Sequence, residues 1–373
     1  MIKGNQKIRI AIVIPGGIGT GHNNIGVPVL ERLIKLLAQD FEITVFSLFK
    51  INQDYVPIGF ELISIGSANR FVRLVEFLSA FIRANRKKKF QVVHGFWALP
   101  SGLLAVLVGK VFKIKSVISV LGGDAIALPQ INYGQLRLWL PRKLVLLALK
   151  HCDEVICLTH YLIKNLKSVG LKRKDIKVIP WGVDTSLFAF REKQITHPVQ
   201  FLHIANLSPV KDQDILLRAF KIISDKIPSI LTIIGEGTLE EPVKALKTEL
   251  GLADKVSFKG LMPYEELPNQ YQEADILLHT SLSEGQSEVV TEAMSSGVVV
   301  CGTNVGLMHD LPACCISVSV KEYKELAGKV LKILNEPESI KEIRSNAYAW
   351  ASTHSIEWTA RELGTIYKRL TDA

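Results

Sequence analysis

Cysteine is scarce in this sequence, and the patterns by which cysteine and histidine form disulfides or hold metals are absent. Five cysteines in 373 residues, with no C-x-x-C spacing, exclude a disulfide scaffold and favour a reducing compartment. The nine histidines form neither H-x3-H nor H-E-x-x-H, and we expect no metal site. No G-x-S-x-G motif is present, which argues against a nucleophilic serine triad.

Long hydrophobic runs are missing as well. The longest strongly apolar uncharged stretch, 96–109, has about 14 residues, whereas a membrane span needs roughly 20. Residues 1–15 place lysines before an apolar run but lack a small-residue cleavage site, so we interpret them as leading into a strand rather than as a signal peptide. We therefore expect a cytoplasmic protein without membrane-spanning helices.

Apolar residues make up 48% of the chain and charged residues 22%, which is typical of globular domains with full cores. Short runs rich in valine and isoleucine alternate with longer amphipathic segments, which predicts an α/β fold with parallel sheets. The first series of expected strands is 8–14, 42–48, 91–94, 116–120, 154–158 and 177–179. The second series is 200–205, 229–234, 256–258, 276–278, 298–301 and 316–318.

The two series indicate two domains. We expect a Rossmann-like domain over 1–180, a linker over 181–198 that has no clear period, and a second Rossmann-like domain over 199–354. A last helix, about 355–373, is expected to pack back on the first domain. Two doubly wound domains that face each other place a cleft between the carboxyl ends of their sheets, where ligands bind.

Charge is divided unevenly between the two halves. Residues 1–190 have a net charge of +15 and residues 191–373 one of −6, within an overall charge of +9. The basic half suggests an anionic partner, with a merely solvated basic face as the alternative. The segment 71–89 is apolar on one face and ends in four basic residues, which predicts peripheral contact with an anionic membrane; a helix packed on the sheet is the alternative. Nucleic acid is not expected as a partner, because the basic residues are not interleaved with aromatic ones.

A glycine-rich loop, PGGIGTGH over 15–22, follows the first expected strand. It matches neither a dinucleotide fingerprint nor a P-loop, because His22 stands where the first needs a third glycine and the second a lysine. What remains is a loop whose backbone N–H groups can face a phosphate or a substrate. A tight strand-to-helix turn is the alternative.

Glu284 and Glu292 form the strongest chemical pattern. Glu284 follows an expected strand that ends near His279, and Glu292 lies about one turn into a helix that Ser287 is expected to cap. The N–H groups at a helix N-terminus carry about half a positive charge and favour a phosphate between the two carboxylates. The carboxylates can accept hydrogen bonds from sugar and ribose hydroxyls.

The spacing of these two glutamates reproduces the E-x7-E motif, and its setting resembles retaining glycosyltransferases of the group 1, or family 4, class. Further segments resemble the family's motifs in the same order over nearly the whole chain: 179–188 (IPWGVD…F), 204–220 (IANL…K…LLRAF), 233–237 (IIGEG) and 297–306 (GVVVCGTNVG). The resemblance implies the GT-B fold, two Rossmann-like domains facing across a cleft.

The activity that the resemblance implies is transfer of a sugar, with retention, from a nucleoside-diphosphate sugar to a hydroxyl of a glycan or lipid-linked acceptor. It implies a place in cell-surface polysaccharide or glycolipid biosynthesis, at the inner face of the cytoplasmic membrane. The nucleotide sugar is a co-substrate, and no separate cofactor is implied.

The resemblance also implies the site residues. Lys211 would hold the donor diphosphate, Glu284 the sugar hydroxyls and Glu292 the ribose. The other implied donor-site residues are Asn206, Gly235, Glu236, Gly237, Leu261, Gly285, Gln286 and Ser287. The implied phosphate and acceptor loop of the first domain consists of Gly16, Gly17, Gly19, Thr20 and Gly21. Asp124 and His94 would lie on the acceptor side, and Asp124 would join Lys211 and Glu284 as a catalytic residue.

Two positions depart from the family pattern. Asn206 stands where the family has a phosphate-binding arginine, and Leu121 where it has the histidine of H-G-x-D. These departures leave open a non-catalytic nucleotide-sugar-binding protein. A sugar-nucleotide epimerase or a phosphorylase on the same fold is a further alternative, because a shared fold does not decide between them.

Four further residues have competing interpretations. Asp212 and Asp214 have the D-x-D spacing of metal-dependent transferases but open a helix, so helix capping is favoured. An ordinary buried histidine is the alternative to an acceptor-site role for His94. Glu288 occupies a usually apolar or small position and is interpreted as a solvated or acceptor-facing carboxylate.

Overall fold

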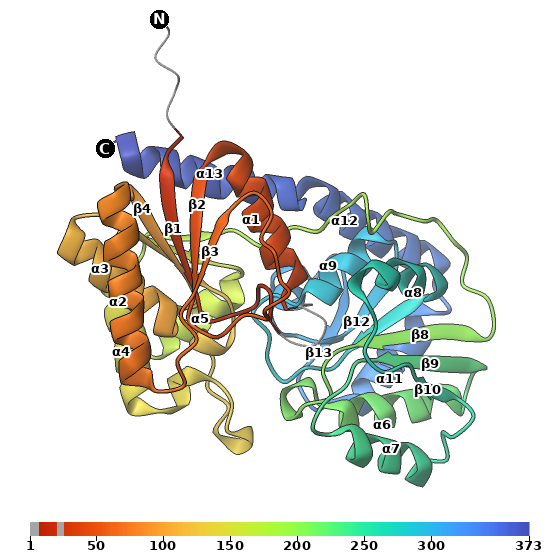
Figure 1. Ribbon diagram of the computed structural model, residues 1–373. Coiled ribbons are helices and arrows are strands. Elements are labelled where there is room, and N and C mark those ends of the chain that lie inside the picture. Colours follow the sequence, from red (N-terminus) through yellow and green to blue (C-terminus); the bar gives the residue numbers. More distant parts are fainter. Residues whose placement is uncertain (1–6, 21–25, 373) are drawn as a thin grey trace, which may run out of the picture. The chain divides into compact units, whose positions relative to one another are not determined.

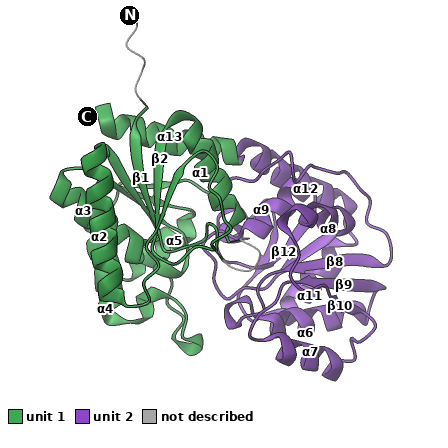
Figure 2. Cartoon of the chain, in the orientation of Figure 1, with its two compact units in different colours: residues 1–181, 356–373 green, residues 182–355 purple. Residues whose placement is uncertain are grey.

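The chain forms two compact units, each built around one parallel sheet (Figure 2). The computed structural model describes residues 7–20 and 26–372. Unit 1 comprises Met1–Trp181 and Ile356–Ala373, and unit 2 comprises Gly182–Ser355. The chain therefore passes between the units twice, at 181–182 and again at 355–356.

The first part of the segment 181–198, expected as a linker, is packed, whereas most of residues 189–198 are exposed. Trp181 is 4% exposed in the core of unit 1, and Phe188 is fully buried in a core cluster of unit 2. The Asp184 carboxylate accepts hydrogen bonds from Ser186 and Leu187, which shapes a turn between them. The segment has no hydrophobic period because its apolar side chains enter two cores from an irregular backbone.

Unit 1 contains seven parallel strands in the order β3-β2-β1-β4-β5-β6-β7 (Figure 1). The strands are β1 (Arg9–Ile14), β2 (Glu42–Ser47), β3 (Glu61–Ser64), β4 (Val92–Phe96), β5 (Lys115–Val120), β6 (Glu154–Cys157) and β7 (Ile176–Val178). Six of them overlap the expected strands. β3 was not expected, because this four-residue edge strand is only partly buried and carries no continuous apolar run.

Helices cover both faces of this sheet. They are α1 (Pro28–Asp40), α2 (Arg70–Lys87), α3 (Leu103–Phe112), α4 (Trp139–His151), α5 (His160–Ser168) and α13 (Ile356–Asp372). The segment 71–89 forms α2, whose buried stripe places Phe77 and Phe81 against the sheet with Val108 of α3. The apolar stretch 96–109 ends β4 and enters α3. Within the described residues, no helix is both long and apolar enough to cross a bilayer.

The last helix, α13, belongs to unit 1 although it follows the whole of unit 2 in sequence. It packs against α1, and its Leu363 and Ile366 are buried in the core of unit 1. Thr359 Oγ1 donates a hydrogen bond to the Pro180 carbonyl at 2.9 Å. The Tyr367 hydroxyl lies 2.6 Å from His94 Nδ1, so one polar contact joins the helix to the centre of the sheet.

Unit 2 contains six parallel strands in the order β10-β9-β8-β11-β12-β13. The strands are β8 (Val199–Ile204), β9 (Ser229–Ile234), β10 (Val256–Phe258), β11 (Ile276–His279), β12 (Val299–Thr303) and β13 (Ile316–Val318). All six overlap the expected strands. From β8 the chain proceeds outward in one direction to β10, and from β11 it proceeds outward in the other direction. The order therefore reverses between β8 and β11, which makes this a topological switch point.

The helices of unit 2 form two layers. They are α6 (Gln213–Ser224), α7 (Glu240–Glu249), α8 (Leu267–Glu273), α9 (Glu288–Ser295), α10 (Leu307–Asp310), α11 (Tyr323–Ile333) and α12 (Pro337–Thr353). One core cluster joins the sheet to α6, α7 and α11, and another joins it to α8, α9 and α12. On β8, Phe201 belongs to the first cluster and Leu202 to the second, as expected for a strand buried on both faces.

We predict that Tyr367→Phe lowers the stability of unit 1. The change keeps the ring but removes the hydroxyl that pairs with His94, and it leaves a buried polar nitrogen without that partner. The expected cost is about 1–3 kcal/mol, measured by chemical denaturation. Tyr348→Phe, at an exposed tyrosine of unit 2, is the matched control and should change stability little. Equal effects of the two substitutions would contradict the prediction.

Candidate functional site

The loops that follow β8 and β11 meet at the switch point of unit 2. Their backbones are joined by a hydrogen bond from Leu282 N to the Val210 carbonyl at 2.8 Å. Thr280 Oγ1 adds hydrogen bonds to the carbonyls of Lys211 and Asp212, at 3.1 and 3.2 Å. Ligands of open α/β sheets bind at this edge, so the paired loops are the candidate site.

An ion pair between Lys211 and Glu284 spans the two loops. Glu284 Oε1 accepts hydrogen bonds from Lys211 Nζ at 2.6 Å and from Ser281 Oγ at 2.5 Å, and it lies 3.3 Å from His279 Nε2. The Glu284 side chain is 12% exposed and that of Lys211 is 22% exposed. Burial by itself raises the pKa of Glu284, but Lys211 and His279 outweigh it and hold the pKa well below its usual value. The carboxylate is therefore ionised at neutral pH.

A second layer of polar groups supports the loop after β8. Gln213 Nε2 donates to the Asn206 carbonyl at 3.1 Å and lies 3.4 Å from His203 Nε2. His203 Nδ1 donates to the Leu278 carbonyl at 2.8 Å. Burial lowers the pKa of His203 to about 4, so the ring is neutral at pH 7. Sequence reasoning did not predict these roles, because His203 and Gln213 matched only the patterns of a strand and a helix.

Helix α9 begins at the candidate site without the cap that was expected. Ser287 precedes the helix at φ +83°, and its side chain makes no capping hydrogen bond. The prediction that Ser287 caps the helix is wrong, because a cap requires an extended backbone that aims the hydroxyl at the first-turn N–H groups. Glu288 in the first turn is half-buried, and burial raises its pKa, with the charge of Glu284 adding to the shift.

The loop after β12 closes on the same place. Leu307 N donates to the Gln286 carbonyl at 3.2 Å. Gly306 has φ +54°, and a Cβ there would lie 2.8 Å from Glu284 Cβ, so only glycine fits without displacing the carboxylate. Gln286 and Ser287 are themselves buried, at 2% and 7% exposure. Three successive sheet loops therefore hold Glu284 in one position.

Glu292 has a different environment from Glu284. It is 3% exposed on α9, and its Oε2 accepts a hydrogen bond from the Tyr271 hydroxyl at 2.7 Å. Tyr264 is a second hydrogen-bonding partner. Burial raises the pKa of Glu292 to about 7, against the opposing effect of the two tyrosines. Sequence reasoning missed both tyrosines, which lie seven positions apart in a segment that carried no recognised motif.

The loops after β8, β9 and β10 form the remaining edge of the candidate site. Gly235 has φ +128°, and a Cβ there would lie 2.0 Å from the Ala205 carbonyl oxygen, which explains the glycine. The Leu261 N–H donates to Glu236 Oε1 at 3.3 Å. Asn206 is exposed at this edge. The expected donor-site residues thus all lie on loops at the carboxyl end of one sheet or at the start of α9.

The glycine-rich loop follows β1 in unit 1. Gly17 N donates to Thr20 Oγ1 at 3.1 Å, and Val27 N donates to the Gly17 carbonyl at 2.7 Å. These bonds close a turn, which matches the alternative interpretation of a strand-to-helix turn for this part of the loop. Gly21 and His22 lie outside the described residues. The phosphate and acceptor role of the loop stays a prediction.

Asp124 and His94, expected on the acceptor side, are engaged inside unit 1. The Asp124 carboxylate is 1% exposed and accepts hydrogen bonds from Ala98 N at 2.7 Å and Gly122 N at 2.8 Å. Burial raises its pKa, against the effect of these N–H groups. Asp124 therefore fixes the loop after β5 to the loop after β4, and its expected catalytic role stays a prediction.

His94 is fully buried, and both ring nitrogens are engaged. Nδ1 lies 2.6 Å from the Tyr367 hydroxyl and Nε2 lies 2.9 Å from Ser119 Oγ. Burial lowers the pKa of His94 to about 3, so it is neutral at pH 7. The ordinary buried histidine is the interpretation that fits, and the acceptor-side role does not.

The D-x-D spacing does not produce a metal-binding arrangement. Asp214 forms an exposed ion pair with Arg218 at 2.9 Å. Asp212 precedes α6 at φ +50°. Burial raises the pKa of its carboxyl and the Ile215 N–H in the first turn acts to lower it, so this side chain interacts with the start of the helix. In the part of the chain that the structure describes, no three His, Cys, Asp or Glu side chains are grouped to hold a metal ion.

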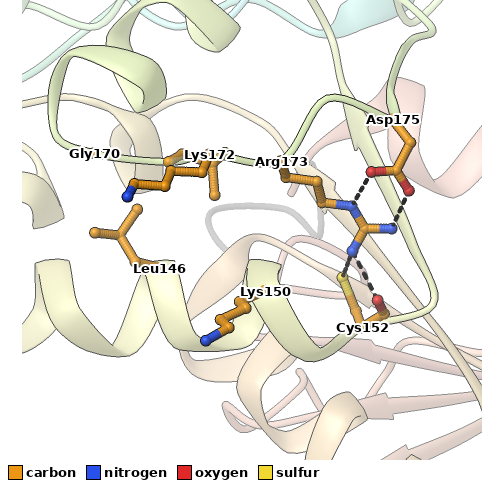
Figure 3. A pocket seen from close by; sticks show the side chains of 8 residues that line it. Leu146, Lys150, Cys152, Gly170, Lys172, Arg173 and Asp175 are labelled. Carbon is orange, nitrogen blue, oxygen red and sulfur yellow. Dashed lines mark hydrogen bonds and ion pairs between the residues drawn. The ribbon is translucent and has the colours of Figure 1, made fainter.

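A pocket of about 690 Å³ lies in unit 1 (Figure 3). It is bounded by the end of α4 and the segment after α5. At the pocket wall, the Arg173 guanidinium donates hydrogen bonds to the Asp175 carboxylate from two nitrogens and to the Cys152 carbonyl from the third. None of the lining residues belongs to the candidate donor site.

Two doubly wound units, one with polar loops gathered at its switch point, are the architecture of the GT-B transferases. Sucrose-phosphate synthase from Thermosynechococcus elongatus superposes with a TM-score of 0.81 at 19% identity, covering 98% of this chain and 99% of that one. HepE from Anabaena, solved with UDP and glucose, superposes with a TM-score of 0.75 at 17% identity, covering 97% and 100%. This chain has the GT-B fold.

Sequence comparison identifies the family. The model for glycosyl transferases group 1 matches residues 187–350, and that for glycosyltransferase family 4 matches residues 27–187. The chain is 24% identical over 321 residues to N-acetyl-alpha-D-glucosaminyl L-malate synthase of Bacillus anthracis, which covers 81% of this chain and 80% of that protein. It is 30% identical over 171 residues to mannosylfructose-phosphate synthase of Agrobacterium fabrum, which covers 41% and 38%. The chain belongs to the group 1 glycosyltransferases.

We predict that Glu292→Gln changes how stability depends on pH. The folded pKa of about 7 exceeds the unfolded value of about 4.3, so the folded protein binds more protons between them and its stability falls as pH rises from about 5 to about 7. The loss approaches about 3 kcal/mol and should be absent in the variant.

Chemical denaturation between about pH 5 and about pH 8 measures this difference. Glu265→Gln, at an exposed glutamate of unit 2, is the matched control and should keep the wild-type pH dependence. Parallel profiles for Glu292→Gln and the wild type would show that Glu292 does not titrate in this range.

Proposed function

We propose that this glycosyltransferase moves a sugar, with retention, from a nucleoside-diphosphate sugar bound in unit 2 to a hydroxyl of a glycan or lipid-linked acceptor. The observation that carries the proposal is the Lys211–Glu284 pair, held at the switch point beside the start of α9. A cation and a helix N-terminus suit a diphosphate, and an ionised carboxylate beside them suits sugar hydroxyls.

Each part of the nucleotide-sugar donor then has a protein partner of matching chemistry. Lys211 binds the diphosphate, and Glu284 accepts hydrogen bonds from the sugar, because its low pKa keeps it ionised. Glu292, on the same helix, accepts from the ribose hydroxyls. The backbone around 285–287 offers N–H groups to sugar or phosphate, and Gly235–Gly237 with Leu261 flank the nucleotide. HepE, which was solved with UDP and glucose, supports a donor of this class.

The chemistry needs charge stabilisation more than a nucleophile. Negative charge develops on the leaving diphosphate, and Lys211 with the α9 N-terminus is placed to stabilise it. In the proposed reaction the acceptor attacks from the face that the leaving group departs, and the departing phosphate helps to remove the acceptor proton. A glycosidase-like pair of carboxylates is then not required.

We place the reaction at the inner face of the cytoplasmic membrane, in cell-surface polysaccharide or glycolipid biosynthesis. The five cysteines are all unpaired and buried, which fits a reducing compartment. The charge of +15 on residues 1–190 fits an acceptor presented at an anionic surface.

We predict that Lys211→Ala reduces turnover by about 2–4 kcal/mol of transition-state stabilisation, or roughly 30- to 1000-fold in kcat. Lys226→Ala, at an exposed lysine of the same unit, is the control and should retain full activity. Binding of UDP, GDP, ADP, dTDP and CMP by calorimetry selects the donor for the assay. Near-normal turnover of Lys211→Ala would remove this lysine from the site.

The same assay separates the alternatives. Nucleotide binding without any turnover would indicate a non-catalytic binding protein, for which the exposed Asn206 in place of arginine is the first residue to examine. Conversion of the sugar nucleotide without acceptor would indicate an epimerase, and a requirement for phosphate and an oligosaccharide would indicate a phosphorylase.

We propose that Lys211 balances the diphosphate charge in place of a metal ion. Treatment with excess EDTA should therefore leave turnover unchanged within about twofold. A loss of activity that Mg²⁺ or Mn²⁺ restores would contradict a metal-independent reaction.

A further inference from the structure

The neighbouring helices α2, α3 and α4 of unit 1 share a surface that is both apolar and basic. α2 and α3 contact each other through Phe81 and Phe112, whose ring centroids are 5.7 Å apart, and α3 packs against α4. The crossovers that lead to β4, β5 and β6 all proceed in the same direction along the sheet, so right-handed connections place the three helices on one face. Their outer sides therefore face away from the sheet on one side of it, and Figure 1 shows the three helices beside the sheet.

This surface exposes much of the apolar side-chain area of the molecule. Of the eighteen large hydrophobic side chains that are exposed among the described residues, eight lie on these three helices. They are Phe71, Val72, Val75, Leu107, Val111, Trp139, Leu140 and Leu147. Val111 and Trp139 are each 64% exposed. Exposed apolar groups gathered in this way mark an interaction site more often than scattered ones do.

The charge of the same helices is almost entirely positive. Together α2, α3 and α4 contain nine lysines and arginines and one acidic residue, Glu76. On α2, the outward stripe runs from Val72 and Val75 to Arg83 and Arg86, so apolar and basic groups lie on one side of the helix. On α4, Lys143 Nζ lies 5.2 Å from the centre of the Trp139 ring.

The pocket at the end of α4 adds further basic side chains to the surface of these helices (Figure 3). Lys150 and Lys172 line it, and neither makes an ion pair with a described residue. The one carboxylate in its lining, Asp175, is held by Arg173. A phosphate group at the mouth of the pocket would meet two lysines whose charges are not already balanced.

We propose that this docking face, formed by the exposed residues of α2, α3 and α4, binds the surface of an anionic lipid bilayer. An anionic bilayer has an apolar interior beneath a negatively charged surface. The docking face presents apolar side chains surrounded by basic ones, which are complementary to both. A second copy of the chain would bring two strongly basic faces together, which like charges oppose. Docking would bring unit 1 to a lipid-linked acceptor, and this role of the docking face rests on the proposed function.

Co-sedimentation with vesicles tests the binding without donor or acceptor. We expect the wild type to sediment with equimolar phosphatidylcholine and phosphatidylglycerol, but not with phosphatidylcholine alone. Arg83→Glu/Arg86→Glu/Lys143→Glu should weaken binding about 100-fold or more. Val111→Ser/Trp139→Ser/Leu147→Ser should weaken it about tenfold or more, because these side chains enter the interface.

The matched control reverses three exposed lysines of unit 2, in Lys226→Glu/Lys324→Glu/Lys341→Glu. It makes the same change in net charge and should bind vesicles as the wild type does. No sedimentation of the wild type with anionic vesicles, or an equal loss in the control, would overturn the proposal. So would a wild-type dimer that the serine variant dissociates, since a second copy would then cover the face.

Nucleotide binding by calorimetry on the same variants separates this inference from the proposed function. Intact nucleotide binding in variants that no longer sediment supports a separate docking face and shows that the chain is folded. Sedimentation that is intact in a wild type without nucleotide binding would leave the docking face standing and remove the donor site. Failure of sedimentation alone, with nucleotide binding intact, would remove the docking face and leave the donor site.

Discussion

The pair formed by Lys211 and Glu284 joins the two loops on which the candidate site of unit 2 depends. Each loop follows a strand at the switch point, and the loop after β8 contains only one short 3-10 turn, Pro209–Lys211. A largely buried carboxylate requires a cation and hydrogen-bond donors, and Lys211, Ser281 and His279 supply them from both loops. The same contacts that keep Glu284 ionised therefore also hold the loops at a distance suited to one ligand.

The two glutamates of the E-x7-E spacing differ in charge state because their neighbours differ. A lysine and a histidine face Glu284, whereas two tyrosine hydroxyls face Glu292, which is more deeply buried and whose pKa no cation among the described residues lowers. Burial acts on both carboxyls in the same direction, and only the first has a charge that outweighs it. Identical side chains eight residues apart thus provide one fixed anion and one group that titrates near neutral pH.

In unit 1, buried polar residues form contacts within the fold, and most charged side chains are exposed. Asp124 ties two sheet loops together, and His94 joins α13 to the sheet, so neither is available to a ligand. Nine of the basic residues of unit 1 lie on α2, α3 and α4, which also carry exposed apolar side chains. Unit 2 carries the opposite net charge and the candidate donor site. The separation of charge along the sequence therefore corresponds to the division into two units.

The sequence by itself determined the two α/β units, nearly every strand of both sheets and the family, and it singled out Glu284 and Lys211, whose roles stay predictions. Strands buried on both faces carry continuous apolar runs, and motif residues keep their spacing, so both are visible along the chain. Only the tertiary structure decided that His94 and Asp124 are internal, that Ser287 caps nothing, and that Tyr271 faces Glu292. These properties depend on contacts between residues far apart in sequence and on local backbone angles. Periodicity and composition predict neither the contacts nor the angles.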